Sequence, residues 1–325
     1  MNLEPITGDT QKVALRFLKT ASVLLKDQDP CDIIGIHILL DKFSKKLGIT
    51  SRTAKAAIDS ACYDILGKIT RRPVYQIISN TKPAAVPNTV TIYIKSIEET
   101  VKKTKHMMTK YKRNGIRRLK LKLSGNPKLD KKRVLLAARI FPGEFTLDAN
   151  EAYKDAELAV KIFNDIYDVI GSRVVLIEQP SPREDLVKLK YITEGCKIPI
   201  FSDESVATLE ELQRIIEENS VNGINIKPQR AGGIYWGNKM AELAKKSGLK
   251  IMVGCVFEGG VAIAQDVNFL AGISRDVIGS DLDTDLELRD IVTESSKIPF
   301  KNGARIPLSK PGLGIELKTG QEFLK

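Results

Sequence analysis

The 325-residue chain is poor in the residues that many catalytic and structural sites require. It has 2 histidines, 1 tryptophan and 6% aromatic residues. Its 4 cysteines show no Cys-x-x-Cys spacing and stand far apart in the sequence, at Cys31, Cys62, Cys196 and Cys255. This dispersal argues against a zinc site and against a disulfide framework, and it favours a reducing cytoplasm. His37 and His106 both precede the acidic positions described below, which disfavours Ser-His-Asp and zinc-hydrolase chemistry.

Long apolar runs are also absent. No stretch approaches the length of a membrane span, and residues 1–10 lack the charged and apolar regions of a signal peptide. The net charge of +11 is dispersed along the chain. With so few aromatic residues, this charge does not indicate a base-stacking surface, and it fits an acidic substrate or a basic host proteome better. We therefore expect a cytoplasmic protein without a nucleic-acid or membrane partner.

The N-terminal part has helical periodicity. Apolar residues recur on one face over 10–26, and similar patterns cover 34–47 and 51–66, the last one opening at a capping Ser51 or Thr50. Residues 1–86 are therefore predicted to form a helical unit.

After Pro87 short β-branched or apolar runs alternate with longer amphipathic segments, such as 96–114, 155–170, 208–219 and 237–247. Eight strands are predicted, at 90–94, 118–123, 145–148, 174–178, 200–203, 223–227, 251–254 and 277–279. This alternation is typical of parallel β/α units, and eight of them favour a closed barrel over residues 87–285. Residues 286–325 contain short strands and turns, and we expect them to return to the N-terminal helices.

The predicted strands end in charged residues. In a barrel these ends lie at the open face, where functional side chains gather. Asp148, Glu178 and Asp203 end three consecutive strands and supply the oxygen ligands that Mg²⁺ prefers. Asp148 and Asp203 could instead cap the helices that follow, an alternative that weakens when three carboxylates occur in succession.

Lysines end the second and sixth predicted strands. Arg118–Leu123 alternates basic and leucine residues, so Lys120 and Lys122 share one face of a strand. This face is either exposed to solvent or its lysines take part in the function. In an eight-stranded barrel Lys227 would face them across the metal. Nearby cations and burial would lower the pKa of such a lysine enough for proton abstraction. Mg²⁺ and Lys120 could then stabilise an enediolate, and bases on both faces would allow inversion.

At these positions the chain closely resembles the enolase superfamily, in its muconate-lactonising subgroup, and within it the dipeptide epimerases. The motifs that carry this resemblance are Lys120-Leu121-Lys122, Leu147-Asp148-Ala149-Asn150, Ile177-Glu178-Gln179-Pro180, Ser202-Asp203-Glu204-Ser205, Asn225-Ile226-Lys227 with Gly232-Gly233, and Lys310-Pro311-Gly312-Leu313-Gly314.

The resemblance implies an α/β fold, a modified TIM barrel with a partial, mainly helical capping domain. It also implies one Mg²⁺ per subunit held by Asp148, Glu178 and Asp203. Lys122 and Lys227 would be the acid/base catalysts, and Lys120 would stabilise the enediolate.

The same resemblance distinguishes dipeptide epimerases by an Asp-x-Asp after the eighth strand, which binds the α-ammonium group of the substrate. Asp281 and Asp283 occupy this place, and Asp285 extends the cluster. Buried carboxylates suit a free amino terminus and would be costly beside an acylated one. Cys255 and Glu258, after the seventh strand, match a family position near the substrate and are expected in the pocket wall.

One departure concerns the N-terminus. Judged by the usual size of such two-domain chains, family members begin with roughly fifty further residues. These residues form a three-stranded sheet that closes over the site. This chain begins near the segment that follows the sheet. The missing sheet is either a truncation or genuine.

The favoured interpretation is a Mg²⁺-dependent epimerase of an L-Ala-Glu-like dipeptide from peptidoglycan turnover. The alternatives are an o-succinylbenzoate synthase, an N-acylamino acid racemase, or a truncated non-catalytic homologue. The partner is then a small dipeptide, and a homo-oligomer stays open.

Overall fold

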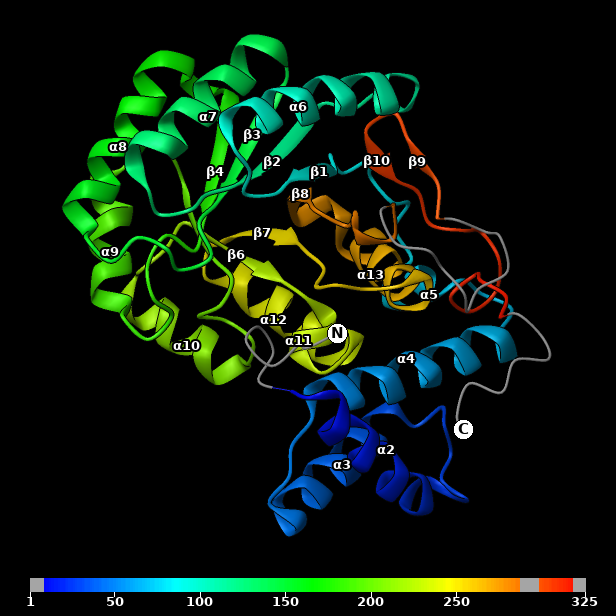
Figure 1. Ribbon diagram of the computed structural model, residues 1–325. Coiled ribbons are helices and arrows are strands. Elements are labelled where there is room, and N and C mark those ends of the chain that lie inside the picture. The colour runs from blue at the N-terminus through cyan, green and yellow to red at the C-terminus, as the bar shows by residue number, and fades with distance from the viewer. Residues whose placement is uncertain (1–8, 287–297, 318–325) are drawn as a thin grey trace.

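A computed structural model describes residues 9–286 and 298–317 (Figure 1). Its centre is a sheet of eight parallel strands in sequence order, with helices around it. The strands are β1 (Thr89–Ile92), β2 (Arg118–Lys122), β3 (Glu144–Asp148), β4 (Val174–Glu178), β5 (Ile200–Ser202), β6 (Gly223–Ile226), β7 (Lys250–Val253) and β8 (Val277–Ser280). The eight predicted strands are confirmed.

The sheet closes into a barrel through a few contacts between its first and last strands. A single parallel bridge joins Asn88, just before β1, to Ser280 at the end of β8. The amide of Ser280 donates to the carbonyl of Pro87 at 2.9 Å. The predicted modified TIM barrel is therefore confirmed.

The helices of the barrel form an outer shell over the apolar faces of the strands. They are α6 (Ile97–Tyr111), α7 (Pro127–Ile140), α8 (Ala156–Ile170), α9 (Leu186–Gly195), α10 (Leu209–Glu218), α11 (Pro228–Ala231), α12 (Ile234–Lys246) and α13 (Gly260–Ile273). Leu119 and Leu121 of β2 are fully buried in the core that these helices share with the strands. Because side chains alternate along a strand, Lys120 and Lys122 point the other way, into the barrel.

A small apolar cluster fills the barrel interior below its open end. Leu176, Phe201 and Met252 form this cluster, separate from the main core, and Ile278 packs against it. Leu176 lies two residues before Glu178 and therefore on the same face of β4. Apolar side chains from β4, β5, β7 and β8 therefore fill this part of the barrel interior.

Three longer helices form the N-terminal unit: α2 (Gln11–Leu25), α3 (Ile33–Leu47) and α4 (Arg52–Ile69). Thr10, Asp32 and Ser51 cap their N-termini with side-chain oxygens, and of the two caps predicted for α4, Ser51 or Thr50, it is Ser51 that caps the helix. The short α5 (Val74–Ile78) follows and packs on α13.

A buried hydrogen-bond cluster joins this unit to the barrel. Asp59 on α4 accepts from the amide of Ile234 at 2.6 Å and contacts His37 Nε2 at 2.7 Å. A Cβ on Gly233, at φ +126°, would lie 2.3 Å from Asp59 Cγ. The backbone of Gly233 approaches Asp59 so closely that a side chain at this position would clash with it.

The C-terminal part forms the hairpin β9 (Phe300–Lys301) and β10 (Ala304–Arg305), and then returns to α4. The amide of Leu313 donates to Asp64 Oδ1 at 2.9 Å. Of the predicted segments, residues 1–8, 287–297 and 318–325 lie outside the described residues. The domain boundaries at 86/87 and 285/286 stay predictions.

Candidate active site at the mouth of the barrel

The register of the strands places the predicted site residues side by side. Lys122 of β2 pairs with Asp148 of β3, and Asp148 pairs with Glu178 of β4. Paired residues of parallel strands project to the same side of the sheet, so all three side chains point into the barrel mouth. Asp203 follows β5 directly, and Lys227 follows β6.

Lys120 lies at the centre of the acidic residues. Its side chain is 2% exposed, and its Nζ lies 2.8 Å from Asp148 Oδ2 and 2.7 Å from Glu178 Oε2. It also donates to Asp281 Oδ2. Lys120 thus joins two predicted metal ligands to the segment after β8.

Lys122 is the more accessible lysine of β2. Its Nζ donates to Asp148 Oδ2 at 2.6 Å and to Asn150 Oδ1 at 2.8 Å. Asn150 has the left-handed backbone conformation, with φ +39°, and its side-chain Nδ2 donates to Glu204 Oε1 at 2.9 Å. Asn150 therefore connects Lys122 to the strand end that carries Asp203.

Lys227 lies on the other side of the mouth. Its Nζ donates to Asp203 Oδ2 at 2.7 Å, while Arg230 NH1 donates to Asp203 Oδ1 at 2.6 Å. β2 and β6 are four strands apart in the eight-stranded order, and Lys122 and Lys227 line the same cavity. The structure therefore brings together two amines from opposed strands.

Asp281 and Asp283 both line this cavity, from the segment after β8. Asp283 Oδ2 accepts from the amide of Thr91 at 2.7 Å. A Cβ on Gly254 would lie 2.6 Å from Asp281 Oδ1, so glycine is needed at the end of β7. Asp285 instead pairs with Arg305 NH2 at 2.6 Å and does not line the cavity.

The loop after β7 forms one wall of the cavity. Cys255, Val256 and Phe257 line it, and Phe257 stacks on Tyr93 with 6.3 Å between ring centroids. The thiol of Cys255 donates to the carbonyl of Asp281 at 3.2 Å. Glu258 lies behind this wall, where its Oε1 accepts from the amide of Val256 at 2.8 Å.

Carboxyl groups outnumber cations at this mouth. Among the described residues, six carboxyl groups lie at the mouth with four basic groups; the carboxyl groups are Asp148, Glu178, Asp203, Glu204, Asp281 and Asp283, and the basic groups are Lys120, Lys122, Lys227 and Arg230. Burial and the charge of Asp148 raise the pKa of Glu178 to about 8. Burial and the charge of Asp281 raise the pKa of Asp283 to about 6. The mouth is electrostatically suited to further positive charge.

The expectation of a lowered lysine pKa counts a bound Mg²⁺ among the nearby cations and stays a prediction, while the protein's own groups shift the pKa of Lys227 in the opposite direction. Burial alone would lower it, but the carboxylates of Asp203 and Glu178 outweigh burial and the charge of Lys120, and they raise the pKa of Lys227 above its ordinary value. The pKa of Lys120 is likewise raised, because Asp148, Asp281 and Glu178 outweigh its burial. Both groups are ammonium ions at neutral pH.

The donor set fits a Mg²⁺ ion chemically. Asp148, Glu178 and Asp203 are buried carboxylates on adjacent strand ends, and hard oxygen ligands are what Mg²⁺ selects. In this structure Lys120 pairs with Glu178, and Lys227 pairs with Asp203. Within residues 9–286 and 298–317, no three His, Cys, Asp or Glu side chains are grouped closely enough to hold a metal ion.

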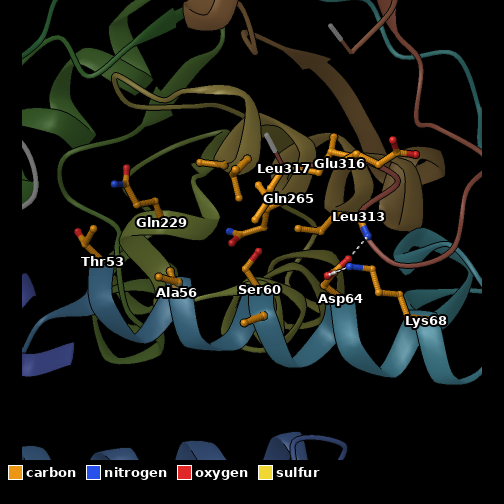
Figure 2. A pocket seen from close by; sticks show the side chains of 15 residues that line it. Thr53, Ala56, Ser60, Asp64, Lys68, Gln229, Gln265, Leu313, Glu316 and Leu317 are labelled. Atoms are coloured by element: carbon orange, nitrogen blue, oxygen red, sulfur yellow. Dashed lines mark hydrogen bonds and ion pairs between the residues drawn. The ribbon is translucent and has the colours of Figure 1, made fainter. Parts of the chain in front are cut away.

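A second, larger cavity lies beside the mouth, between α4 and α13. It has a volume of about 1000 Å³, with Ala56, Val261, Leu313 and Leu317 among its lining residues. Figure 2 shows Ser60 pointing from α4 toward Gln265 across this space. Its side chains are mostly apolar or neutral, with charged groups from Asp64, Lys68 and Glu316 at one end.

Three contributors were not predicted from the sequence as site residues. Arg230 neutralises Asp203, Asn150 binds Lys122, and fully buried Arg133 on α7 donates to the carbonyl of Lys122 at 2.8 Å. Asn150 and Arg230 each follow a predicted ligand or catalyst by two or three residues, and that proximity was the available signal. Arg133 carries no such signal, because its contact depends on how α7 packs on β2.

Two family comparisons cover most of the chain. Residues 103–321 match the enolase C-terminal domain-like family, and residues 4–79 match the N-terminal domain of the mandelate racemase / muconate lactonizing enzyme family.

Individual relatives agree with these matches. An L-Ala-D/L-Glu epimerase of Clostridium acetobutylicum is 32% identical over 288 residues, which cover 88% of this chain and 77% of that protein. An N-succinyl-L-Arg/Lys racemase of Bacillus cereus is 30% identical over 318 residues, covering 96% and 81% respectively. The dipeptide epimerase of Enterococcus faecalis V583, solved with Mg and the dipeptide L-Leu-L-Tyr, is similar in structure with a TM-score of 0.86, 27% identity, and coverage of 96% of this chain and 85% of that chain.

Proposed function

This chain belongs to the enolase superfamily, and from that membership and the geometry of its barrel mouth we propose that it is a Mg²⁺-dependent dipeptide epimerase. The observation that carries the proposal is the pair of amines, Lys122 and Lys227, on opposed strands of one cavity that Asp281 and Asp283 also line. Inversion at a carbon atom needs one group to remove the proton from one face and another to return it on the opposite face.

The two lysines supply these groups. In one direction Lys122 takes the α-proton of the C-terminal residue, and Lys227, an ammonium ion held by Asp203, returns a proton to the opposite face of the same carbon. In the other direction the roles exchange. Lys122 is oriented by Asn150 and Asp148, which hold its Nζ at 2.8 and 2.6 Å.

Lys120 stabilises the negative charge that develops when the proton leaves. Its raised pKa keeps it positive, and its burial strengthens its interaction with an enediolate. Asp148, Glu178 and Asp203 would hold Mg²⁺, which when bound supplies positive charge to the substrate carboxylate and acidifies the α-proton.

Asp281 and Asp283 bind the free α-ammonium group of the dipeptide. Both are buried, and Asp281 Oδ1 has no hydrogen-bond partner among the described residues. A buried carboxylate oxygen without a donor is costly, and an ammonium group would satisfy it. An acylated amine, which is neutral, would not.

For the side chains of the substrate, our proposal is an L-Ala-Glu-like dipeptide. It rests on the relative in Clostridium acetobutylicum and on the positive net charge of +11.

All four cysteines are free thiols, which supports a reducing cytoplasmic location. Within the described part of the chain no helix is both long and apolar enough to cross a membrane.

The test is solvent exchange at the α-carbon. L-Ala-L-Glu is incubated with the protein and Mg²⁺ in D₂O, together with a panel of other dipeptides. Deuterium at the α-carbon of the C-terminal residue, accompanied by the second diastereomer, supports the proposal. No incorporation with any dipeptide rejects it.

A racemase of N-acylated amino acids is the second candidate, favoured by the N-succinyl-L-Arg/Lys racemase relative. Exchange of N-succinyl amino acids but not of dipeptides would support it. Replacing Asp283 with Asn separates the two, because only the dipeptide reaction depends on an ammonium partner. An inactive homologue predicts no exchange with any substrate.

A further inference from the structure

A buried carboxyl pair behind the cavity wall has no role in the proposed chemistry. Asp266 lies in α13 and is 0% exposed, and Glu258 in the preceding loop is 3% exposed. Both carboxylate oxygens of Asp266 and Oε2 of Glu258 lack a hydrogen-bond donor among the described residues. Figure 2 shows Gln265, the residue before Asp266, at the large cavity, which Asp266 does not line.

Among the groups around Asp266, the side chain of Glu258 is the one that acts on it most strongly. Two ionised carboxylates cannot hydrogen-bond to each other, because each oxygen is an acceptor only. One proton between them supplies the missing donor and removes one buried negative charge.

The other charged groups that face Asp266 do not neutralise it. Asp281, after β8, adds negative charge, and Lys227, after β6, attracts it but is paired with Asp203. Burial and the charge of Glu258 raise the pKa of Asp266 well above its ordinary value. Cys255 is a neutral neighbour, because burial and the nearby carboxylates raise the pKa of its thiol.

We propose that Asp266 and Glu258 share one proton, and that this carboxyl–carboxylate pair positions the cavity wall formed by Cys255, Val256 and Phe257. Glu258 fixes the wall through two contacts. Its Oε1 accepts from the amide of Val256 at 2.8 Å, and its backbone amide donates to Thr284 Oγ1 at 3.2 Å. Thr284 follows Asp283 directly, so the pair also links the wall to the segment that would bind the ammonium group.

Asp266→Asn and Asp266→Ala test this role. Asparagine keeps a donor for Glu258 and mimics the protonated acid, so its KM for the dipeptide should stay within about twofold of the original. Alanine leaves Glu258 buried without a donor, and KM should rise by about tenfold with a smaller change in kcat. Equal losses in the two variants would overturn the inference.

Thermal stability as a function of pH is an independent readout. An acid with a raised pKa in the folded state loses stabilising free energy as pH rises from its unfolded pKa toward the folded one. Asp266→Asn cannot ionise, so its melting temperature should exceed that of the original protein by a margin that grows by about 2 °C or more between about pH 5 and about pH 8. A constant margin would contradict the shared proton.

Asp168→Asn is the matched control, because Asp168 is a surface residue whose side chain is 58% exposed and pairs with Lys197. Its effect on the melting temperature should not vary over this pH range. The proposal that the Asp266–Glu258 pair positions the cavity wall rests on the proposed function, but the measurement of thermal stability does not. Failure of exchange in the unmodified protein therefore rejects the function, and a constant stability margin rejects the pair.

Discussion

Two cavities in the described part of this protein differ in size and in charge. The cavity beside α4 has a volume of about 1000 Å³ and mostly apolar or neutral walls, whereas the cavity at the barrel mouth has about 80 Å³ and is lined by lysines and carboxylates. Only the small one lies where the ends of the parallel strands converge. Position in the fold and a concentration of buried charge, and not volume, favour the small cavity as the candidate site.

Removal of a proposed catalytic lysine should separate the two cavities most sharply. Lys227→Ala and Lys122→Ala should each lower the rate of dipeptide epimerisation by about 1000-fold or more, because one face of the α-carbon loses its acid/base group. The measurement is the rate of formation of the second diastereomer. Lys68→Ala, at the edge of the large cavity, should leave this rate unchanged. Equal effects from both cavities would contradict the assignment.

Loss of a proposed metal ligand should be the next largest effect. Asp203→Asn should weaken Mg²⁺ binding, measured by calorimetry without substrate, by about 100-fold, because one charged oxygen ligand is lost. Circular dichroism checks that the variant remains folded. An unchanged Mg²⁺ affinity would show that Asp203 serves only Lys227 and Arg230.

Asp283 should control dipeptide affinity and its pH dependence. Its raised pKa of about 6 means that it is ionised above that pH, so KM should rise as pH falls through about 6. Asp283→Asn should raise KM by about 10-fold to 100-fold at neutral pH and remove this dependence. The check is KM across the pH range, and a variant that retains the acidic rise in KM would place the titration elsewhere.

A change in the large cavity should have the smallest effect. Ala61→Leu extends an exposed side chain of α4 into that space and should alter the free energy of unfolding by about 0.5 kcal/mol or less. The exchange rate should stay the same. A variant that loses exchange while remaining folded would assign this cavity a part in the reaction.

The barrel and the residues at its mouth were largely predictable from the sequence because both follow local patterns. Alternation along β2 predicts which face Lys120 and Lys122 share, and the acidic strand ends predict that Asp148 and Glu178 are neighbours. These patterns do not depend on distant packing.

The remaining features depend on tertiary contacts. α13 was not named from the sequence, because residues 263–272 are buried on every side and show no amphipathic period. The direction of the pKa shift of Lys227 depends on the balance of two carboxylates, burial and Lys120. The Asp266–Glu258 contact joins α13 to a loop, and neither residue alone indicates it.

The most direct test of the central claim is deuterium incorporation at the α-carbon of a dipeptide in D₂O with Mg²⁺, followed for the unmodified protein and for Lys227→Ala. The account predicts incorporation together with inversion for the unmodified protein, and loss of inversion in the variant. Inversion that survives without Lys227, or no incorporation with any dipeptide, would contradict it.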